Sequence, residues 1–302
     1  MKNKIVLLVL VVVLLVMAGC STTNSSEENV PPPSLDDTGD NNATHGDSTT
    51  ESEDNNNAES EKPNGDSKPD NNAGGEVETE KPVPPPKPVI TYDKVAMVTS
   101  NKVNIREGKS SNSRVVGTMK RGEGLMIVEE NMSGWHKVYY KGKHAYIYGS
   151  NTRVLRFPKS NKKSIEKVIE EGQKLVGFPY VYGSQRYHFG NGILNTKFRY
   201  GEFDCSALTQ YAYYKGANVI INVTTRSQVM EGMLVRGDIR RGDLLFFTNS
   251  SRRHKKGVEK VGHVAIYLGD NHIMHTSEGY AVIEEISNSR WNNYLVSKRY
   301  IV

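Results

Sequence analysis

The chain has 302 residues, 36% of them hydrophobic, and a formal net charge of +5. The charge is segregated: residues 21–90 hold sixteen Asp/Glu against four Lys, whereas residues 91–302 hold 33 Lys/Arg against 18 Asp/Glu. The acidic stretch has no aromatic residue and is rich in Ser, Asn, Pro and Gly, so it cannot bury a core of its own. Only two cysteines are present, Cys20 and Cys205, which excludes a small fold held by disulfides.

The first twenty residues have the pattern of an export signal. Two lysines precede thirteen apolar residues at 5–17, which are fewer than the ~20 needed to span a membrane but suit a signal-peptide core. Ala18 and Gly19 then precede Cys20. This segment resembles a bacterial lipoprotein signal, which implies that residues 1–20 are the signal and that Cys20 carries a lipid. The alternative is ordinary secretion with Cys20 lost or inert.

Residues 21–90 are predicted to form a disordered, acidic tether. Like charges extend such a coil, and the proline-rich end at 82–88 stiffens it. This length suits a protein that reaches from a membrane into a thick cell wall. The alternative is a simple linker whose length has no functional role.

Residues 91–155 are predicted to form a small all-β barrel. Short runs rich in Val, Ile and Tyr alternate with turn residues, which predicts about five strands. The runs lie at 102–106, 114–119, 124–128, 135–140 and 145–148. Their order resembles a bacterial Src-homology-3-like domain of cell-wall enzymes, which implies peptide or wall binding. Trp135 is either a binding residue or part of the core, and His136 and His144 are expected at the surface.

Residues 160–302 hold the candidate chemistry. A packing helix is predicted from apolar residues spaced over 165–176, and a second helix is predicted to begin at Cys205, with Asp204 as its N-cap and Gly216 as its stop. A thiol in the first turn of a helix is favoured as thiolate by the helix dipole. The alternative is a buried structural cysteine, but a first-turn position favours exposure.

A nucleophilic thiol also needs a base. His263 and His275 lie in two β-like runs joined by a turn at residues 269–271. The two side chains share a face if the loop has three residues or the hairpin contains a bulge, and a two-residue loop alone would separate them. His272 points the other way and is expected to be exposed.

This half of the chain resembles the NlpC family of papain-like cell-wall cysteine peptidases. The matching stretches, in the family's order, are GFPYVYG at 177–183, FDCSA at 203–207, RGDLLFF at 241–247, GHVAIYLG at 262–269 and HIMH at 272–275. The resemblance implies an α+β fold in which helices pack on an antiparallel sheet. Three stretches depart from the family pattern and flank the presumed cleft: the long loop at 184–202, Ala207, and residues 221–225. The basic loop 251–260 is a further candidate for shaping specificity.

The resemblance also implies the roles of the site residues. Cys205 is the nucleophile, His263 the base and then the acid, and His275 the residue that orients His263. Tyr180 assists the oxyanion, while Asp204 and Ser206 contact the free amine of a stem peptide. No metal or cofactor is implied.

The predicted function is an extracytoplasmic, lipid-anchored cell-wall hydrolase. By the resemblance, it cuts peptidoglycan stem peptides at the γ-D-glutamyl–diamino acid bond. Its expected partners are peptidoglycan and, through Cys20, the membrane. The basic charge alone would also suit nucleic acid, which an exported protein does not meet. Two alternatives stay open: an inactive wall-binding lipoprotein, and an amidase or acyltransferase that uses the same three residues.

Overall fold

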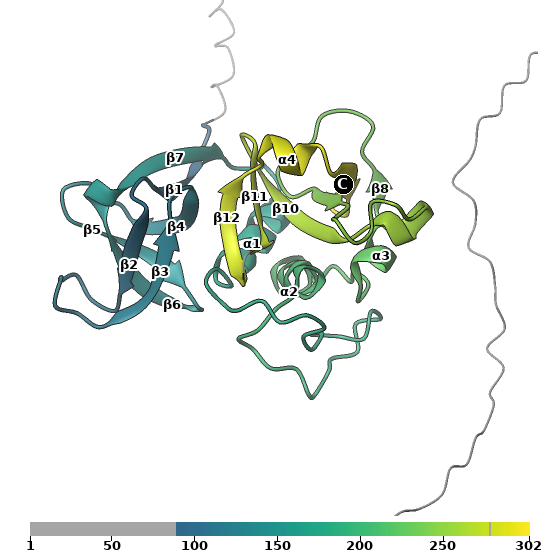
Figure 1. The fold of residues 1–302 in the computed structure, drawn as a ribbon, viewed down its shortest axis with the longest axis horizontal. Helices are drawn as coiled ribbons and strands as arrows, with labels where there is room; N and C mark the ends of the chain where they lie inside the picture. The colour runs from purple at the N-terminus through teal and green to yellow at the C-terminus, as the bar shows by residue number, and fades with distance from the viewer. Residues whose placement is uncertain (1–88, 278) are drawn as a thin grey trace, which may run out of the picture. The chain divides into compact units, whose positions relative to one another are not determined.

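The computed structural model describes residues 89–277 and 279–302, so the expected signal peptide, Cys20 and nearly all of the tether lie outside the described residues. The described residues all belong to one compact unit (Figure 1). Within them, no helix has the length and apolar character to cross a bilayer.

The first part of the described chain is built from seven strands. They are β1 (Tyr92–Val98), β2 (Lys102–Arg106), β3 (Val115–Lys120), β4 (Glu123–Glu129), β5 (Trp135–Tyr140), β6 (Lys143–Tyr148) and β7 (Thr152–Pro158), with a short 3-10 helix at Gly149–Asn151. The five predicted strands are present, and β1 and β7 are added to them. These two pair antiparallel along their whole length, from Tyr92–Pro158 to Val98–Thr152. β7 was missed because its arginines obscure the alternation of a half-buried strand.

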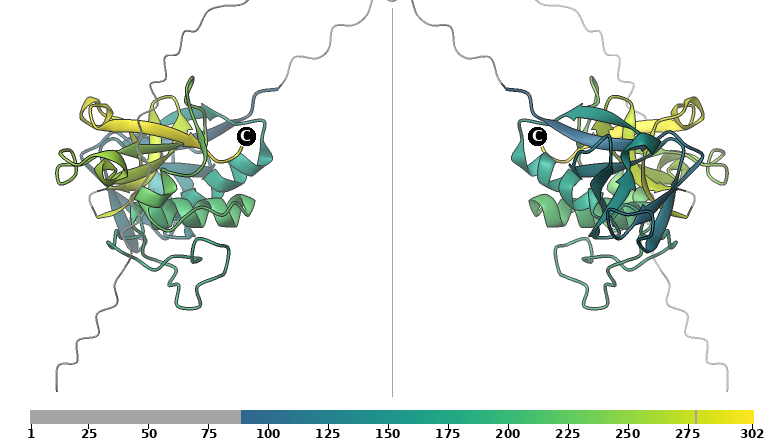
Figure 2. Two further views of the ribbon diagram at one scale, coloured as in Figure 1. Left: turned by 90° about the vertical axis from the view of Figure 1, so that its right-hand side faces the viewer. Right: turned by 90° about the vertical axis from the view of Figure 1, so that its left-hand side faces the viewer.

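The second part begins with α1 (Lys163–Gln173) and α2 (Cys205–Ala217), which pack on each other. The elements that follow are α3 (Thr225–Gln228), β8 (Met233–Leu234), β9 (Leu244–Phe247), a 3-10 helix at Gly257–Lys260, β10 (His263–Gly269), β11 (His272–Ser277), β12 (Tyr280–Glu285), α4 (Asn288–Trp291) and β13 (Tyr294–Arg299). The two views of Figure 2 show α1 and α2 on the same side of the C-terminal strands. This arrangement is the expected α+β fold, with helices on an antiparallel sheet.

Strand β9 shows how the sheet separates two cores. Leu244 and Phe246 belong to the large cluster that includes the buried residues of α1 and α2, whereas Leu245 and Phe247 belong to a smaller cluster on the other face. Successive side chains of a strand point to opposite faces, so a continuous apolar run is buried on both sides. The strand β9 is therefore buried on both faces of the sheet.

Gly216 lies inside α2 and does not end it. The helix ends at Asn218, whose φ of 53° is left-handed and whose N–H bonds back to Tyr213 and Tyr214. A Cβ on Gly216 would lie 2.4 Å from the backbone nitrogen of Val168 in α1. The glycine is needed for the close approach of the two helices, which local pattern alone did not indicate.

Two histidines expected at the surface are buried. The His136 ring accepts a hydrogen bond from the N–H of Asn131 at 2.9 Å and lies 3.2 Å from the hydroxyl of Thr152. His272 packs against the ring of Phe157 in β7, with ring centroids 5.0 Å apart. In both cases the covering residue comes from the region of β7, the strand that the sequence did not predict.

Candidate active site

Cys205 opens α2, as expected. The preceding residue, Asp204, has an extended backbone, and its carboxylate accepts the N–H of Ala207 at 2.8 Å, which is the geometry of an N-cap. The Cys205 residue is only 8% exposed, so the expectation of an exposed first turn is wrong. Its sulfur lies 3.5 Å from the hydroxyl of Thr225, and the N–H of Val264, the residue after His263, also bonds to it.

The resting state of Cys205 is the thiol. Burial, followed by the negative charge of Asp204, raises the pKa of the thiol, and the hydrogen bonds from Thr225, Val264 and the Ser206 N–H only partly oppose this. The helix N-terminus therefore does not by itself hold a thiolate here, contrary to the sequence expectation, because desolvation acts against the charge. The site consequently needs a base that removes the thiol proton during the reaction.

His263 and His275 meet as the hairpin argument required. β10 and β11 pair through Ile266–Met274 and Tyr267–Ile273, and the register then shifts so that Gly269 pairs with His272. The loop has two residues, Asp270 and Asn271, both with positive φ, and the bulge restores the shared face. The Nε2 of His263 lies 2.9 Å from the Nδ1 of His275.

Two further residues extend this pair, and the sequence analysis missed both. The Nε2 of His275 lies 2.9 Å from Oε1 of Glu284 in β12, and Arg290 of α4 donates to the same oxygen at 2.8 Å. The signal in the sequence was the apolar run at 280–283 that ends in two glutamates, one strand beyond the matched motifs. His275 pairs with Val282 across the two strands, which places Glu284 at the diagonal position on the same face.

Burial governs the charges of these groups. It is the main cause that lowers the pKa of His275, and the positive charge of Arg290 acts the same way, although Glu284 opposes both. Burial, then His275 and Arg290, lowers the pKa of His263 well below its usual range. For Glu284, burial works against ionisation, but contacts with His275 and Arg290 outweigh it and lower the pKa. Both imidazoles are therefore neutral near pH 7 and Glu284 is ionised.

These charge states determine where the protons lie. The carboxylate of Glu284 can only accept, so the Nε2 of neutral His275 carries the proton and its Nδ1 is an acceptor. The Nε2 of His263 must then donate to that Nδ1. The lone pair of His263 is left on Nδ1, the nitrogen free to take a proton from a thiol. No direct hydrogen bond joins this imidazole to the sulfur in the described residues.

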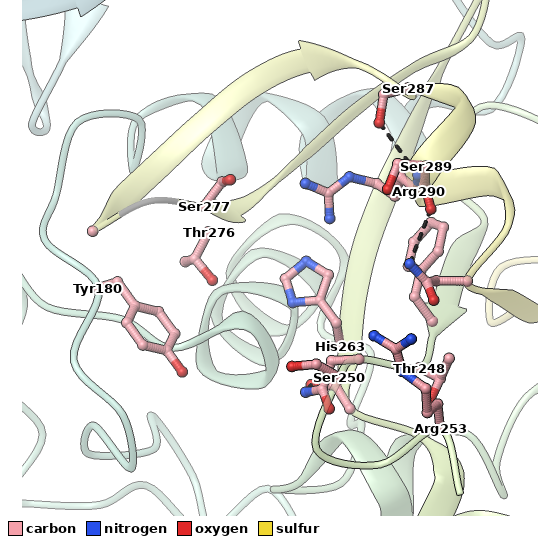
Figure 3. A pocket seen from close by; sticks show the side chains of 15 residues that line it. Tyr180, Thr248, Ser250, Arg253, His263, Thr276, Ser277, Ser287, Ser289 and Arg290 are labelled. Atoms are coloured by element: carbon pink, nitrogen blue, oxygen red, sulfur yellow. Dashed lines mark hydrogen bonds between the residues drawn. The ribbon is translucent and has the colours of Figure 1, made fainter.

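Two adjoining cavities form a groove over these residues. One, of about 650 Å³, is lined by His263 and Arg290, and the other, of about 510 Å³, by Cys205. Tyr180, Asn249 and Gly262 line both cavities. Figure 3 shows the side chains of Tyr180, His263 and Arg290 around the first. Burial, and then the neighbouring Cys205 and Asp204, raises the pKa of Tyr180, so its hydroxyl keeps its proton and can donate.

Asp204 and Ser206 also line the Cys205 cavity, but neither is free. Both accept from the guanidinium of Arg186, which comes from the long loop at 184–202. That loop has no helix or named strand, and it is fixed by aromatic contacts: Tyr187 and Phe198 each pack on Tyr211 of α2, with centroids 5.1 and 5.7 Å apart. Sequence reasoning noted the loop but not Arg186.

No group of three or more His, Cys, Asp or Glu residues with metal-binding geometry occurs in the part of the chain that the structure describes.

In the β part, Trp135 is half-buried and its ring centroid lies 5.2 Å from that of Tyr148, and both side chains line a surface cavity with Lys102 and Arg106. This placement gives Trp135 both a packing contact and an accessible edge.

Two family models match the chain: the NlpC/P60 family at residues 177–300, and the bacterial SH3 domain at residues 101–153. Among curated relatives, the gamma-DL-glutamyl hydrolase of Bacillus subtilis (strain 168) is 24% identical over 196 residues, covering 64% of this chain and 43% of the relative. The gamma-D-glutamyl-L-lysine dipeptidyl-peptidase of Bacillus cereus (strain ATCC 10987 / NRS 248) is 29% identical over 164 residues, covering 54% and 44%.

The chain thus spans less than half the length of these two relatives. Among solved structures, an NlpC/P60 family protein from Bacillus cereus ATCC 10987 is 19% identical, with a TM-score of 0.37, covering 70% of this chain and 64% of that one. The matched residues contain Cys205, His263, His275 and Glu284. Residues 177–300 of this chain are therefore an NlpC/P60 domain, and residues 101–153 before it are a bacterial SH3 domain.

Proposed function

We propose that this chain is a cysteine endopeptidase that hydrolyses peptidoglycan stem peptides at the bond between γ-linked D-glutamate and the diamino acid. The observation that carries the proposal is the row of contacts from His263 through His275 to Glu284, in a groove that Cys205 also lines. The names of the two curated relatives support the γ-glutamyl bond.

In the proposed reaction, Nδ1 of His263 takes the thiol proton as the sulfur of Cys205 attacks the peptide carbonyl carbon. A carbon–sulfur bond forms, the carbon–nitrogen bond breaks, and the imidazolium of His263 returns the proton to the leaving amine. Water then hydrolyses the thioester with His263 again acting as base. The Cys205 N–H and the Tyr180 hydroxyl are the donors proposed for the oxyanion.

The domain boundaries, export and anchoring are part of the same proposal. Residues 1–20 act as a lipoprotein signal, residues 21–90 as a tether, residues 91–155 as the wall-binding domain and residues 160–302 as the catalytic domain. Cys20 bears the lipid, and the site therefore works outside the cytoplasm on the wall. Replacement of Cys20 by Ala should release the protein from the membrane fraction into the medium, and its retention there would contradict the anchor.

The test of the activity is digestion of purified peptidoglycan by the full-length protein, with mass spectrometry of the products. Cleavage inside the stem, absent in Cys205→Ala, supports the proposal. Release of whole stems from the sugar would mean an amidase, and products joined to an added acyl acceptor would mean a transferase. Intact peptidoglycan together with unlabelled Cys205 in a thiol-reactive probe assay would mean a wall-binding scaffold.

A further inference from the structure

Arg186 is built into the wall of the Cys205 cavity. Its Nη2 donates to Oδ2 of Asp204 at 2.8 Å and to the hydroxyl of Ser206 at 3.1 Å. The rest of the guanidinium is held by backbone, with Nη1 on the carbonyl of Ser184 at 2.6 Å and Nε on the carbonyl of Val223. The side chain is 17% exposed. The positive charge is therefore fixed beside the nucleophile.

The carboxylate of Asp204 has no capacity left for a ligand. Oδ1 accepts from the N–H of Ala207 at 2.8 Å and from the hydroxyl of Ser206 at 3.0 Å. Oδ2 accepts from the N–H of Gly183 at 3.2 Å in addition to Arg186. Its side chain is 7% exposed. A ligand ammonium would have to displace a guanidinium held by four hydrogen bonds.

The other charges around this cavity are also unfavourable for a cation. Asp204 is the only acidic residue among the described residues that line it, while Arg226 and Arg252 line it as well. Both of these arginines pair with Glu259, at 3.2 and 2.9 Å, which lies outside the lining. The pocket beside Cys205 thus carries no unpaired carboxylate and several guanidinium groups.

We propose that this pocket rejects a free N-terminal ammonium and accepts a peptide whose N-terminal nitrogen is acylated. This deepens the proposed function and rests on it: the substrate class is the stem peptide still joined to the glycan, not the released peptide. An amide nitrogen carries no charge, so it avoids the repulsion that Arg186 exerts on an ammonium. The proposal replaces the amine contact that the sequence predicted for Asp204 and Ser206.

The test is a competition between two natural substrates, one with the N-terminal nitrogen acylated by the sugar and one with that nitrogen free. A disaccharide-linked stem peptide and the same stem released by an amidase are mixed in equal amounts with the full-length protein, and kcat/KM for each is measured from the products. The wild type should cleave the linked stem about tenfold faster or more. Arg186→Gln removes the charge and should reduce this ratio at least about tenfold, whereas Arg186→Lys keeps the charge and should keep the preference.

The outcomes separate the two levels of the proposal. Cleavage of both substrates at equal rates, or with the free amine preferred, would overturn the inference and leave the endopeptidase intact. An unchanged ratio in an Arg186→Gln protein that unfolds at the wild-type temperature would also overturn it. Failure of the wild type to cleave within either stem would refute the endopeptidase, and the inference with it. The wild-type ratio needs no variant, so a misfolded Arg186→Gln does not prevent a decision.

Discussion

Glu284 in β12 accepts a hydrogen bond at 2.9 Å from Nε2 of His275 in the neighbouring strand β11, and this contact orients His275. The contact is a hydrogen bond from a neutral imidazole, since burial lowers the pKa of His275. This bond leaves Nδ1 of His275 as an acceptor, so Nε2 of His263 carries the proton. The free lone pair of His263 is therefore on its Nδ1. A carboxylate outside the lining of both groove cavities thus determines which nitrogen can act as base.

Replacing Glu284 by Ala should therefore impair the chemical step. His275 could then carry its proton on Nδ1, facing the N–H of His263, and Arg290 would be left as an unpaired charge beside both rings. We expect kcat to fall roughly 10- to 100-fold with little change in KM, because the orientation of the base is lost and no binding contact is.

The control for Glu284 is its neighbour Glu285, which is exposed and bonds to Asn271. Glu285→Ala should retain wild-type kinetics. Equal kinetics for Glu284→Ala and Glu285→Ala would contradict the orienting role.

Replacing Thr225 by Val should make the Cys205 thiol less reactive at a given pH. The Thr225 hydroxyl is the side-chain hydrogen-bond partner of the sulfur and acts to lower the pKa of Cys205. Without it the pKa should rise further, so alkylation of Cys205 by iodoacetamide should shift to higher pH and kcat/KM should fall several-fold. Thr225→Ser retains a hydroxyl and is the matched control. Superimposable alkylation profiles for the Val and Ser variants would show that the hydroxyl does not act on the thiol.

The stability of the protein should fall as the pH is lowered from 7 to 5.5. The pKa values of His263, His275, His136 and His188 are all lowered in the fold, mainly by burial. The unfolded chain binds protons near pH 6.5 while the folded chain does not, so each histidine costs up to ~1.4 kcal/mol per pH unit in this window. Urea unfolding at pH 7.5 and 5.5 measures the loss. His263→Ala should show a smaller loss, and an identical loss would contradict the lowered pKa.

At alkaline pH the stability should fall again, through Cys205. Burial raises the pKa of its thiol, so the folded protein keeps a proton that the unfolded chain releases above about pH 8.5. Stability attributable to this thiol is complete below that pH and is lost as the pH rises toward the folded value. Cys205→Ala should reduce the decline in urea midpoint between pH 8 and 10. If the urea midpoint of Cys205→Ala declined as steeply as that of the wild type, the loss of stability would not come from this thiol.

Replacing Arg241 should destabilise the protein, because this side chain links the β part to the part that follows it. The buried guanidinium bonds to Asp93 of β1, to Glu166 of α1 at 2.8 Å and to the carbonyl of Leu268 in β10 at 2.9 Å. Arg241→Met leaves two carboxylates without this partner, which should lower the free energy of unfolding by about 3–5 kcal/mol. The exposed neighbour Arg240 is the control, and an Arg241→Met protein as stable as Arg240→Met would refute the prediction.

Local pattern predicted much of the fold correctly. The helix that begins at Cys205 with Asp204 as its cap was predicted because capping is a property of neighbouring residues. Strand parity allowed His263 and His275 to share a face only with a three-residue loop or a bulge, and the structure has a two-residue loop with the bulge. The burial of His136 and His272 was not predicted, since the side chains that cover them come from distant parts of the chain.

The sequence by itself determined the order of the elements, the two matched domains and the three residues that the proposed chemistry needs. The elements depend on periodicity and capping, which act over a few residues, whereas the domains and the three residues were indicated by the resemblance of short motifs to those of known families. Only the tertiary structure decided that the thiol is buried and that Glu284 bonds to both His275 and Arg290. It also decided that the carboxylate of Asp204 is already paired with Arg186. Desolvation and ion pairing depend on what lies within a few ångströms in space, and those neighbours come from segments that no local pattern connects.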